Sequence, residues 1–503
     1  MKRWIQWFIL LAILAGAVYF SAEQFGNIIP ALISAVFSLT VILVALIIFL
    51  ENRHPASTVA WLMVLALLPI VGFIFYILFG RNFRKRRIFE RKEARDADAY
   101  SRIDYRFPSS DQDLSVFSES HLRMFTLANK VARSPVSFKT KATVLTNGEE
   151  TFTAILRELK QAAHHIHMEY YIFRDDDIGN QIKEILIRKA KEGVEVRFLY
   201  DAVGSFKLPS SFIRELQAAG VQVAAFLPVS FPFLSNKINY RNHRKIIIID
   251  GKVGFVGGIN VGDEYLGRDT AYGFWRDTHL MITGEAVQTL QIIFMQDFSY
   301  MTKEALAIEN YLPPSSGEMP EDGAVQIIAS GPDNKWETMK SMFFSMITSA
   351  KQSIWIATPY FIPDEDIFSS LKVAALSGID IKLLFPKKPD KWIPFLASHS
   401  YFDALLEAGV KIYEYEKGFM HAKVLIVDRT MASVGSANMD MRSFHLNFEV
   451  NAFLYQTRSV RKLVSDFEAD LLDASPLSRE QFANRRLAER LFESAARLLS
   501  PLL

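Results

Sequence analysis

The sequence contains no cysteine, and its 57 lysine and arginine residues are almost balanced by 55 aspartate and glutamate residues, giving a formal net charge of +2 at pH 7. The absence of cysteine excludes disulfide bonds and thiolate metal ligands. An H-E-x-x-H motif and an acidic ligand cluster are also missing, so we expect no metal. The nearly neutral charge is not typical of a nucleic-acid-binding protein, and we expect no nucleic-acid partner.

Long apolar stretches are present near the start of the chain, at residues 4–20, 28–50 and 59–79. The second and third are long enough to span a bilayer, for which about 20 residues suffice. The first could be a third span, an interfacial helix or a signal-like segment. A dense basic group follows residue 80, and positive charge next to a membrane segment favours the cytoplasmic side. We therefore predict a membrane-embedded segment over 1–80 and a basic linker over 81–112 that contacts anionic lipids.

The segment NYRNHRKIIIIDGKVGFVGGIN, residues 239–260, combines polar and charged residues with a buried β-strand. Its isoleucine run is typical of a strand that is covered on both faces. Side chains two positions apart point to the same face of a strand, so His243 and Lys245 should project together. Asp250 ends the strand, and Gly258 and Asn260 follow the next one.

A second segment, MHAKVLIVDRTMASVGSAN, repeats this pattern with the same spacing. The corresponding residues are His421, Lys423, Asp428, Ser436 and Asn438. The flanking helix and strand patterns repeat as well, which indicates two related α/β lobes. We predict a pseudo-twofold pair of lobes, each a mixed sheet flanked by helices, over residues 113–310 and 324–503, joined by a Pro-, Ser- and Gly-rich linker over 311–323.

Two H-x-K-x4-D segments, each followed by G-[GS]-x-N, resemble the phospholipase D superfamily. The resemblance implies that both motifs meet at one active site that works without a metal or other cofactor. The residues agree with this, because a lysine beside each histidine would attract a phosphate and repel a divalent cation.

Two histidines that face one phosphorus atom suit a two-step displacement, in which one attacks and the other transfers protons. The resemblance favours His243 as the nucleophile. Lys245 and Lys423 could stabilise the charge on phosphate oxygens, together with Asn260, Asn438, Ser436 and the backbone amides near Gly258 and Ser436.

Acids that lie downstream of each motif, Asp277 and Glu449, are candidates for orienting the two imidazoles. Asp250 and Asp428 belong to the catalytic motifs, but each lies an odd number of residues from its histidine. We therefore expect them to point away from the reacting face and to support the structure.

Several other residues have a structural interpretation. We expect packing and surface roles for His164, His165 and His167, and we expect the acids at 175–177 to cap a helix and face solvent. A substrate role is the weaker interpretation of His399. Loops with Phe231, Phe233, Leu234, Trp392, Ile393, Phe395 and Leu396 suit either a lipid groove or contact between the lobes. Leu487, Leu491, Ala495 and Leu498 recur at helical spacing, and we expect this helix to dock on the second lobe rather than on a membrane.

The basic segment FGRNFRKRR and the stretches GGINVGDEYLG, TPYFIPDEDI and NMDMRSFHLNFE are similar to those of bacterial cardiolipin synthases. That family implies phosphatidyl transfer between two phosphatidylglycerol molecules, through a covalent phosphatidyl-histidine, by a multi-pass enzyme of the bacterial inner membrane with cytoplasmic catalytic lobes. A hydrolase would use the same residues with water as the acceptor. A membrane-tethered nuclease and a non-enzymatic membrane scaffold remain alternatives, although a scaffold has no use for lysines buried beside histidines.

Overall fold

The computed structural model describes most of the chain after residue 113 and parts of the chain before it. The described ranges are 55–67, 114–228, 239–304, 307–312 and 322–500, with isolated positions between 39 and 46 and at 72 and 92. The chain forms two compact units, Met1–Phe83 and Arg84–Leu503.

Helix α3, Pro55–Leu67, is the longest described element of the first unit. Over the parts of the chain that the structure describes, we find no helix with both the length and the hydropathy needed to cross a bilayer. The predicted apolar stretch at 4–20 lies outside the described residues. Those at 28–50 and 59–79 and the basic linker at 81–112 are described only in part.

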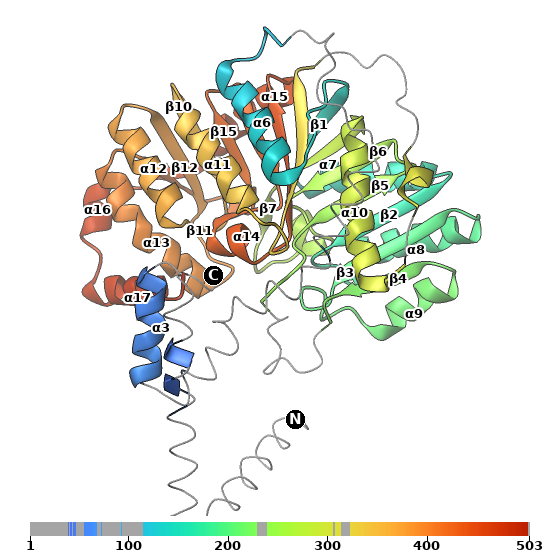
Figure 1. The fold of residues 1–503 in the computed structure, drawn as a ribbon, viewed down its shortest axis with the longest axis horizontal. Helices are drawn as coiled ribbons and strands as arrows, with labels where there is room; N and C mark the ends of the chain where they lie inside the picture. The colour runs from blue at the N-terminus through green and yellow to red at the C-terminus, as the bar shows by residue number, and fades with distance from the viewer. Residues whose placement is uncertain are drawn as a thin grey trace, which may run out of the picture. The chain divides into compact units, whose positions relative to one another are not determined.

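The second unit contains two large mixed sheets (Figure 1). The first sheet has the order β1-β8-β6-β5-β2-β3-β4. Strands β2, β3 and β4 run parallel, and the remaining neighbours are antiparallel. The bounds are β1 Thr140–Thr146, β2 His165–Tyr170, β3 Glu195–Asp201, β4 Gln222–Phe226, β5 Lys245–Ile249, β6 Val253–Gly257 and β8 Thr278–Gly284.

The second sheet repeats this arrangement, with the order β19-β13-β12-β10-β15-β16-β18-β9. From β9 to β13 its strands correspond one to one with those of the first sheet, and β19 is an addition at the edge. The prediction of two related α/β lobes with mixed sheets is therefore confirmed. The bounds are β9 Ala324–Ser330, β10 Ser353–Ala357, β12 Asp380–Pro386, β13 Lys411–Tyr415, β15 Val424–Val427, β16 Met431–Gly435, β18 Glu449–Tyr455 and β19 Ala474–Pro476.

Helices flank both sheets (Figure 1). Asp176 caps the N-terminus of α8 by accepting a hydrogen bond from Gly179 N, so the predicted capping role of the acidic run is confirmed for this residue. Asp364 caps α12 in the same way. The bounds are α7 Asn147–Gln161, α8 Asp177–Lys191, α9 Ser210–Ala218, α10 Ala286–Thr302, α11 Thr338–Ser349, α12 Glu365–Leu376, α13 Trp392–Glu407, α14 Met441–His445, α15 Arg458–Leu472, α16 Arg479–Ala483 and α17 Leu487–Arg497.

Helix α6, Glu119–Ala132, does not belong to the lobe in which the predicted boundaries place it. Its buried residues Met124, Phe125 and Ala128 join the hydrophobic core of the second lobe, where they pack with α11 and β9. Among the described residues, the chain thus passes from the second lobe at α6 to the first sheet at β1. Hydrophobic periodicity predicts a buried face but not which sheet covers it.

One hydrophobic core runs through the contact between the lobes. It combines Val256 and Leu280 of the first sheet with Val434 and Ala452 of the second. The central strands of the two sheets contact each other across this core, β6 and β8 on one side and β16 and β18 on the other. The strands of the two histidine motifs, β5 and β15, lie directly beside them.

Candidate active site

The two histidine motifs are held in place by short backbone contacts between the lobes. Strand β14, Gly418–Met420, pairs in parallel with β7, Phe274–Arg276, of the other lobe. Directly after β14, His421 N donates a hydrogen bond to Arg276 O at 2.7 Å. The equivalent contact on the other side joins His243 N to Phe448 O at 2.9 Å. Each histidine is thus fixed by the backbone just before the acidic residue of the opposite lobe.

The histidine–acid pairs cross between the lobes. His243 Nδ1 lies 2.9 Å from Glu449 Oε2, and His421 Nδ1 lies 2.6 Å from Asp277 Oδ2. Both carboxylates are fully buried. In each neutral imidazole, Nδ1–H donates to the acid, which leaves Nε2 as a lone-pair donor. Within the described part of the chain, neither Nε2 has a hydrogen-bond partner.

Asp277 and Glu449 occupy equivalent places in the two sheets. Asp277 lies two residues before the partner of Gly257 in the β6–β8 ladder, and Glu449 lies two before the partner of Gly435 in the β16–β18 ladder. The longer glutamate is held by Ser436 Oγ at 2.5 Å. At the matching position of the first lobe, a Cβ on Gly258 would collide with the Asp277 carboxylate.

The lysine of each motif lies beside the histidine of the same motif and is almost completely buried. Lys423 Nζ lies 2.8 Å from His421 Nδ1 and 2.5 Å from His421 O, and Lys245 Nζ lies 2.5 Å from His243 O. The positive charge of Lys423 also lowers the pKa of Lys245. This arrangement concentrates positive charge around the two imidazoles, as an anionic phosphodiester requires.

Burial dominates the electrostatics of the site. It lowers the pKa of Lys245 to about 7 and that of Lys423 to about 8. Burial, together with the neighbouring lysines, lowers the pKa of His243 to about 4 and that of His421 to about 3. Both imidazoles are therefore neutral at pH 7 in the free protein. An anion bound between them would raise all four pKa values, because it favours every protonated form.

The carboxylates of Asp250 and Asp428 point away from the histidines and bind the backbone. Asp250 accepts hydrogen bonds from the amides of Ala163, His164 and His165, at the start of β2. Asp428 does the same with residues 351–353 at the start of β10. Both have a positive φ, 54° and 50°, in the turn after the strand.

The predicted phosphate ligands have varied surroundings. The amides of Gly258 and Ser436 donate to Thr278 O and Val450 O, both at 3.0 Å, so these two N–H groups do not point to a phosphate. They close the strand ladders instead. Asn260 Oδ1 accepts from Ile172 N. Asn438 Nδ2 donates to Asp440, and the buried Asn438 Oδ1 has no partner among the described residues.

A buried network behind His243 has no counterpart in the sequence prediction. Arg244 is buried next to His243 in the sequence and pairs with Asp297. It also donates to Glu449 O at 3.1 Å and Ser330 O at 3.1 Å, and so connects the two lobes. The sequence feature that could have indicated this network is an arginine next to a buried isoleucine run. An arginine at a buried position requires a buried acid as its partner. Arg276 is a second buried arginine paired with an acid, since it binds Asp470 of the other lobe at 2.7 Å.

His165, His167 and His399 lie outside the site. His165 and His167 are buried and bond to Gln291, which confirms the packing interpretation for both. His399 is nearly buried, and its Nδ1 lies 2.9 Å from Phe395 O. Its neighbours are Phe385, Phe402 and Phe482, so it belongs to the core of the second lobe. The apolar loop at 231–234 lies outside the described residues.

Two α/β lobes that bring histidine, lysine and crossed acids to one centre define a phospholipase D-like phosphoryl-transfer protein. The family model "Cardiolipin synthase, PLD-like domain" matches residues 155–297 and 343–471, and "Phospholipase_D-nuclease N-terminal" matches 38–81. The chain belongs to the cardiolipin synthase family of phosphatidyltransferases, within the phospholipase D superfamily.

Relatives support this assignment over the whole chain. The chain is 56% identical to the cardiolipin synthase of Alkalihalophilus pseudofirmus, with complete coverage of both proteins. It is 59% identical to cardiolipin synthase 2 of Bacillus anthracis, over 93% of this chain and 91% of that protein. The solved phosphatidylserine synthase of Haemophilus influenzae has the same fold, with a TM-score of 0.57, 14% identity, and coverage of 77% of this chain and 100% of that one.

Proposed function

We propose that this phosphatidyltransferase joins two phosphatidylglycerol molecules into cardiolipin and releases glycerol, through a phosphatidyl-histidine. One observation carries the mechanism. Two imidazoles are each held at Nδ1 by a buried carboxylate of the other lobe, and each has an Nε2 without a partner among the described residues. A nucleophile and a proton donor are then available at one phosphorus atom.

In the first step, His243 Nε2 attacks the phosphorus of one phosphatidylglycerol. The bond from phosphorus to the glycerol oxygen breaks, and His421 gives its proton to the departing oxygen. In the second step, His421 takes the proton of a hydroxyl group on the second phosphatidylglycerol, whose oxygen attacks phosphorus and displaces His243. One phosphodiester replaces another, so no nucleotide is consumed.

The bound phosphodiester sets the protonation states for this sequence. Its negative charge would keep Lys245 and Lys423 protonated and would raise the pKa of His421 enough for it to carry a proton. Glu449 and Asp277 stabilise the positive charge that develops on each imidazole. Both histidines have a buried carboxylate at Nδ1. The choice of His243 as the nucleophile follows the family resemblance.

We further propose that the enzyme is embedded in the bacterial inner membrane by several passes, with the catalytic lobes in the cytoplasm and anionic phospholipids as partners. The three apolar stretches and the basic residues after them support this topology. The N-terminal family match at 38–81 is consistent with it.

Mass spectrometry of the lipids formed from phosphatidylglycerol alone in detergent micelles tests the reaction. We expect cardiolipin and glycerol from the natural chain, and neither from His243→Ala or His421→Ala. His399→Ala is the matched control, since it removes a nearly buried histidine outside the site, and it should retain activity. Phosphatidic acid as the sole product would identify a hydrolase, and the absence of any lipid product would refute the proposal. A phosphatidyl adduct mapped to residue 421 would reverse the roles of the histidines.

A further inference from the structure

The C-terminal helix α17 docks on the second lobe with its polar face. It packs on α13, as predicted, but the face that makes the contact is the opposite of the predicted one. Glu493 and Ala496 are buried, and Arg485 holds Glu493 at 2.8 Å. The leucine stripe that was expected to dock faces outward instead.

The exposed face of α17 is strongly apolar. The exposed fractions are 72% for Leu487, 62% for Leu491, 65% for Phe492, 82% for Leu498 and 41% for Leu499. Leu491 and Leu498 lie seven residues apart and so form one row along the helix. Large apolar side chains gathered on one helix face are unusual on a surface that contacts only water.

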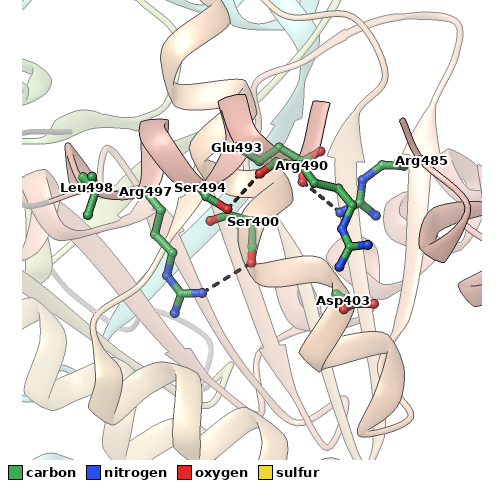
Figure 2. A pocket seen from close by; sticks show the side chains of 8 residues that line it. All are labelled: Ser400, Asp403, Arg485, Arg490, Glu493, Ser494, Arg497 and Leu498. Atoms are coloured by element: carbon green, nitrogen blue, oxygen red, sulfur yellow. Dashed lines mark hydrogen bonds and ion pairs between the residues drawn. The ribbon is translucent and has the colours of Figure 1, made fainter. Parts of the chain in front are cut away.

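A row of arginines runs beside this apolar face. Arg490 and Arg497 have the same seven-residue spacing, each directly before a leucine of the apolar row. They line a hollow of about 440 Å³ between α17 and α13, with Ser400, Asp403 and Ser494 (Figure 2). Arg497 reaches Ser400 O at 3.5 Å, and no carboxylate within the described residues pairs with Arg490.

We infer that α17 lies in the surface of a bilayer rich in anionic phospholipid, with its apolar face among the acyl chains and Arg490 and Arg497 bound to headgroup phosphates. An apolar face bordered by cations is typical of interfacial membrane helices. An antiparallel twofold contact with a second copy would bring the same arginines together, and their repulsion disfavours it. The inference uses the proposed function only to choose phosphatidylglycerol as the anionic lipid.

The absence of cysteine allows a direct test on the full-length chain. Leu491→Cys is labelled with an environment-sensitive fluorophore, and the protein is reconstituted into phosphatidylglycerol vesicles that carry a spin-labelled acyl-chain quencher. We expect at least twofold quenching at residue 491. Leu472→Cys on α15, where the native leucine is 88% exposed, is the matched control and should show no quenching. Arg490→Gln with Arg497→Gln should reduce the quenching at residue 491.

Three results would overturn the inference. Fluorescence at residue 491 that is quenched by aqueous iodide as strongly as at 472 would place the face in water. Protection from both quenchers would mean that protein covers it. Equal lipid quenching in phosphatidylcholine vesicles would remove the role of the arginines. None of these readouts depends on lipid turnover, so failure here is separate from failure of the catalytic proposal.

Discussion

At the scale of single residues, the centre depends on small differences between its two halves. The acid of one half is an aspartate and that of the other a glutamate, and the residue beside each acid adjusts for the difference in length. Gly258 leaves room for Asp277, and Ser436 holds Glu449 with its hydroxyl group. Both imidazoles therefore receive a carboxylate at Nδ1, although the side chains that supply it differ.

Glu449→Gln should reduce kcat by about 10²–10⁴-fold with a much smaller change in KM, because the neutral amide neither fixes the His243 tautomer nor stabilises the imidazolium. Initial rates of cardiolipin formation measure the effect. Glu468→Gln is the matched control, since Glu468 is 51% exposed and pairs only weakly with Arg429 at 3.6 Å. An unchanged kcat in Glu449→Gln would exclude the orienting role.

The pH dependence should report the two lysines. In the free enzyme the pKa is about 7 for Lys245 and about 8 for Lys423, so their charge, and with it binding of the anionic lipid, is present below these values and lost as pH rises through them. We expect kcat/KM to fall over this range. The fall in kcat should lie at higher pH, because bound phosphate raises the lysine pKa values. Coincident profiles would contradict this account.

At the scale of elements, each motif includes an aspartate that anchors a turn. The carboxylate of Asp250 accepts hydrogen bonds from three backbone amides at the start of β2 and thereby joins the end of β5 to β2. Asp428 joins β15 to β10 in the same way. The aspartate of the motif thus holds the strand that carries the histidine and lysine.

Asp250→Ala should lower the free energy of unfolding by about 2–4 kcal/mol, because it removes three hydrogen bonds and places alanine at a positive φ. The folded fraction should keep kcat within about tenfold of the natural chain, unlike His243→Ala. Denaturant unfolding in detergent and lipid mass spectrometry measure the two effects. Loss of all activity in protein that remains folded would instead make Asp250 part of the chemistry.

The sequence predicted the helices, strands and motifs better than it predicted which of them pack against each other. Repeated spacing was sufficient to find both lobes and the histidine pairs, and strand alternation correctly turned Asp250 and Asp428 away from the histidines. Alternation could not identify the partners of α6 or the network around Arg244, since these depend on residues far apart in the chain. It also could not show that the amides of Gly258 and Ser436 are used within the sheets.

At the scale of the whole molecule, the catalytic unit is one folded body with two sheets. The shared core, the β14–β7 pair and the Arg276–Asp470 ion pair all cross the boundary between the lobes. α6 adds a further link, because it precedes the first lobe in sequence and packs in the second. Each lobe has a core largely of its own, and a third core is shared between the two.

A protease site inserted between residues 313 and 321 should therefore be cut without separating the halves. We expect the cleaved protein to elute as a single species in size-exclusion chromatography and to keep at least half of its activity, because the shared core, the β14–β7 pair and the Arg276–Asp470 ion pair join the lobes independently of the chain connection. A matched insertion that is not cleavable controls for the added length. Separation of the halves, or loss of activity after cleavage, would show that the covalent connection holds the centre together.

The crossed acids have a consequence for the history of the chain. A centre in which each half supplies the acid for the other half's histidine is what two identical subunits form around a twofold axis. The two lobes of this single chain reproduce the arrangement of such a homodimer. Because the two halves belong to one chain, each position can change independently of its equivalent in the other half, which is not possible in a homodimer. The aspartate and glutamate that hold the two histidines are a visible result of that freedom.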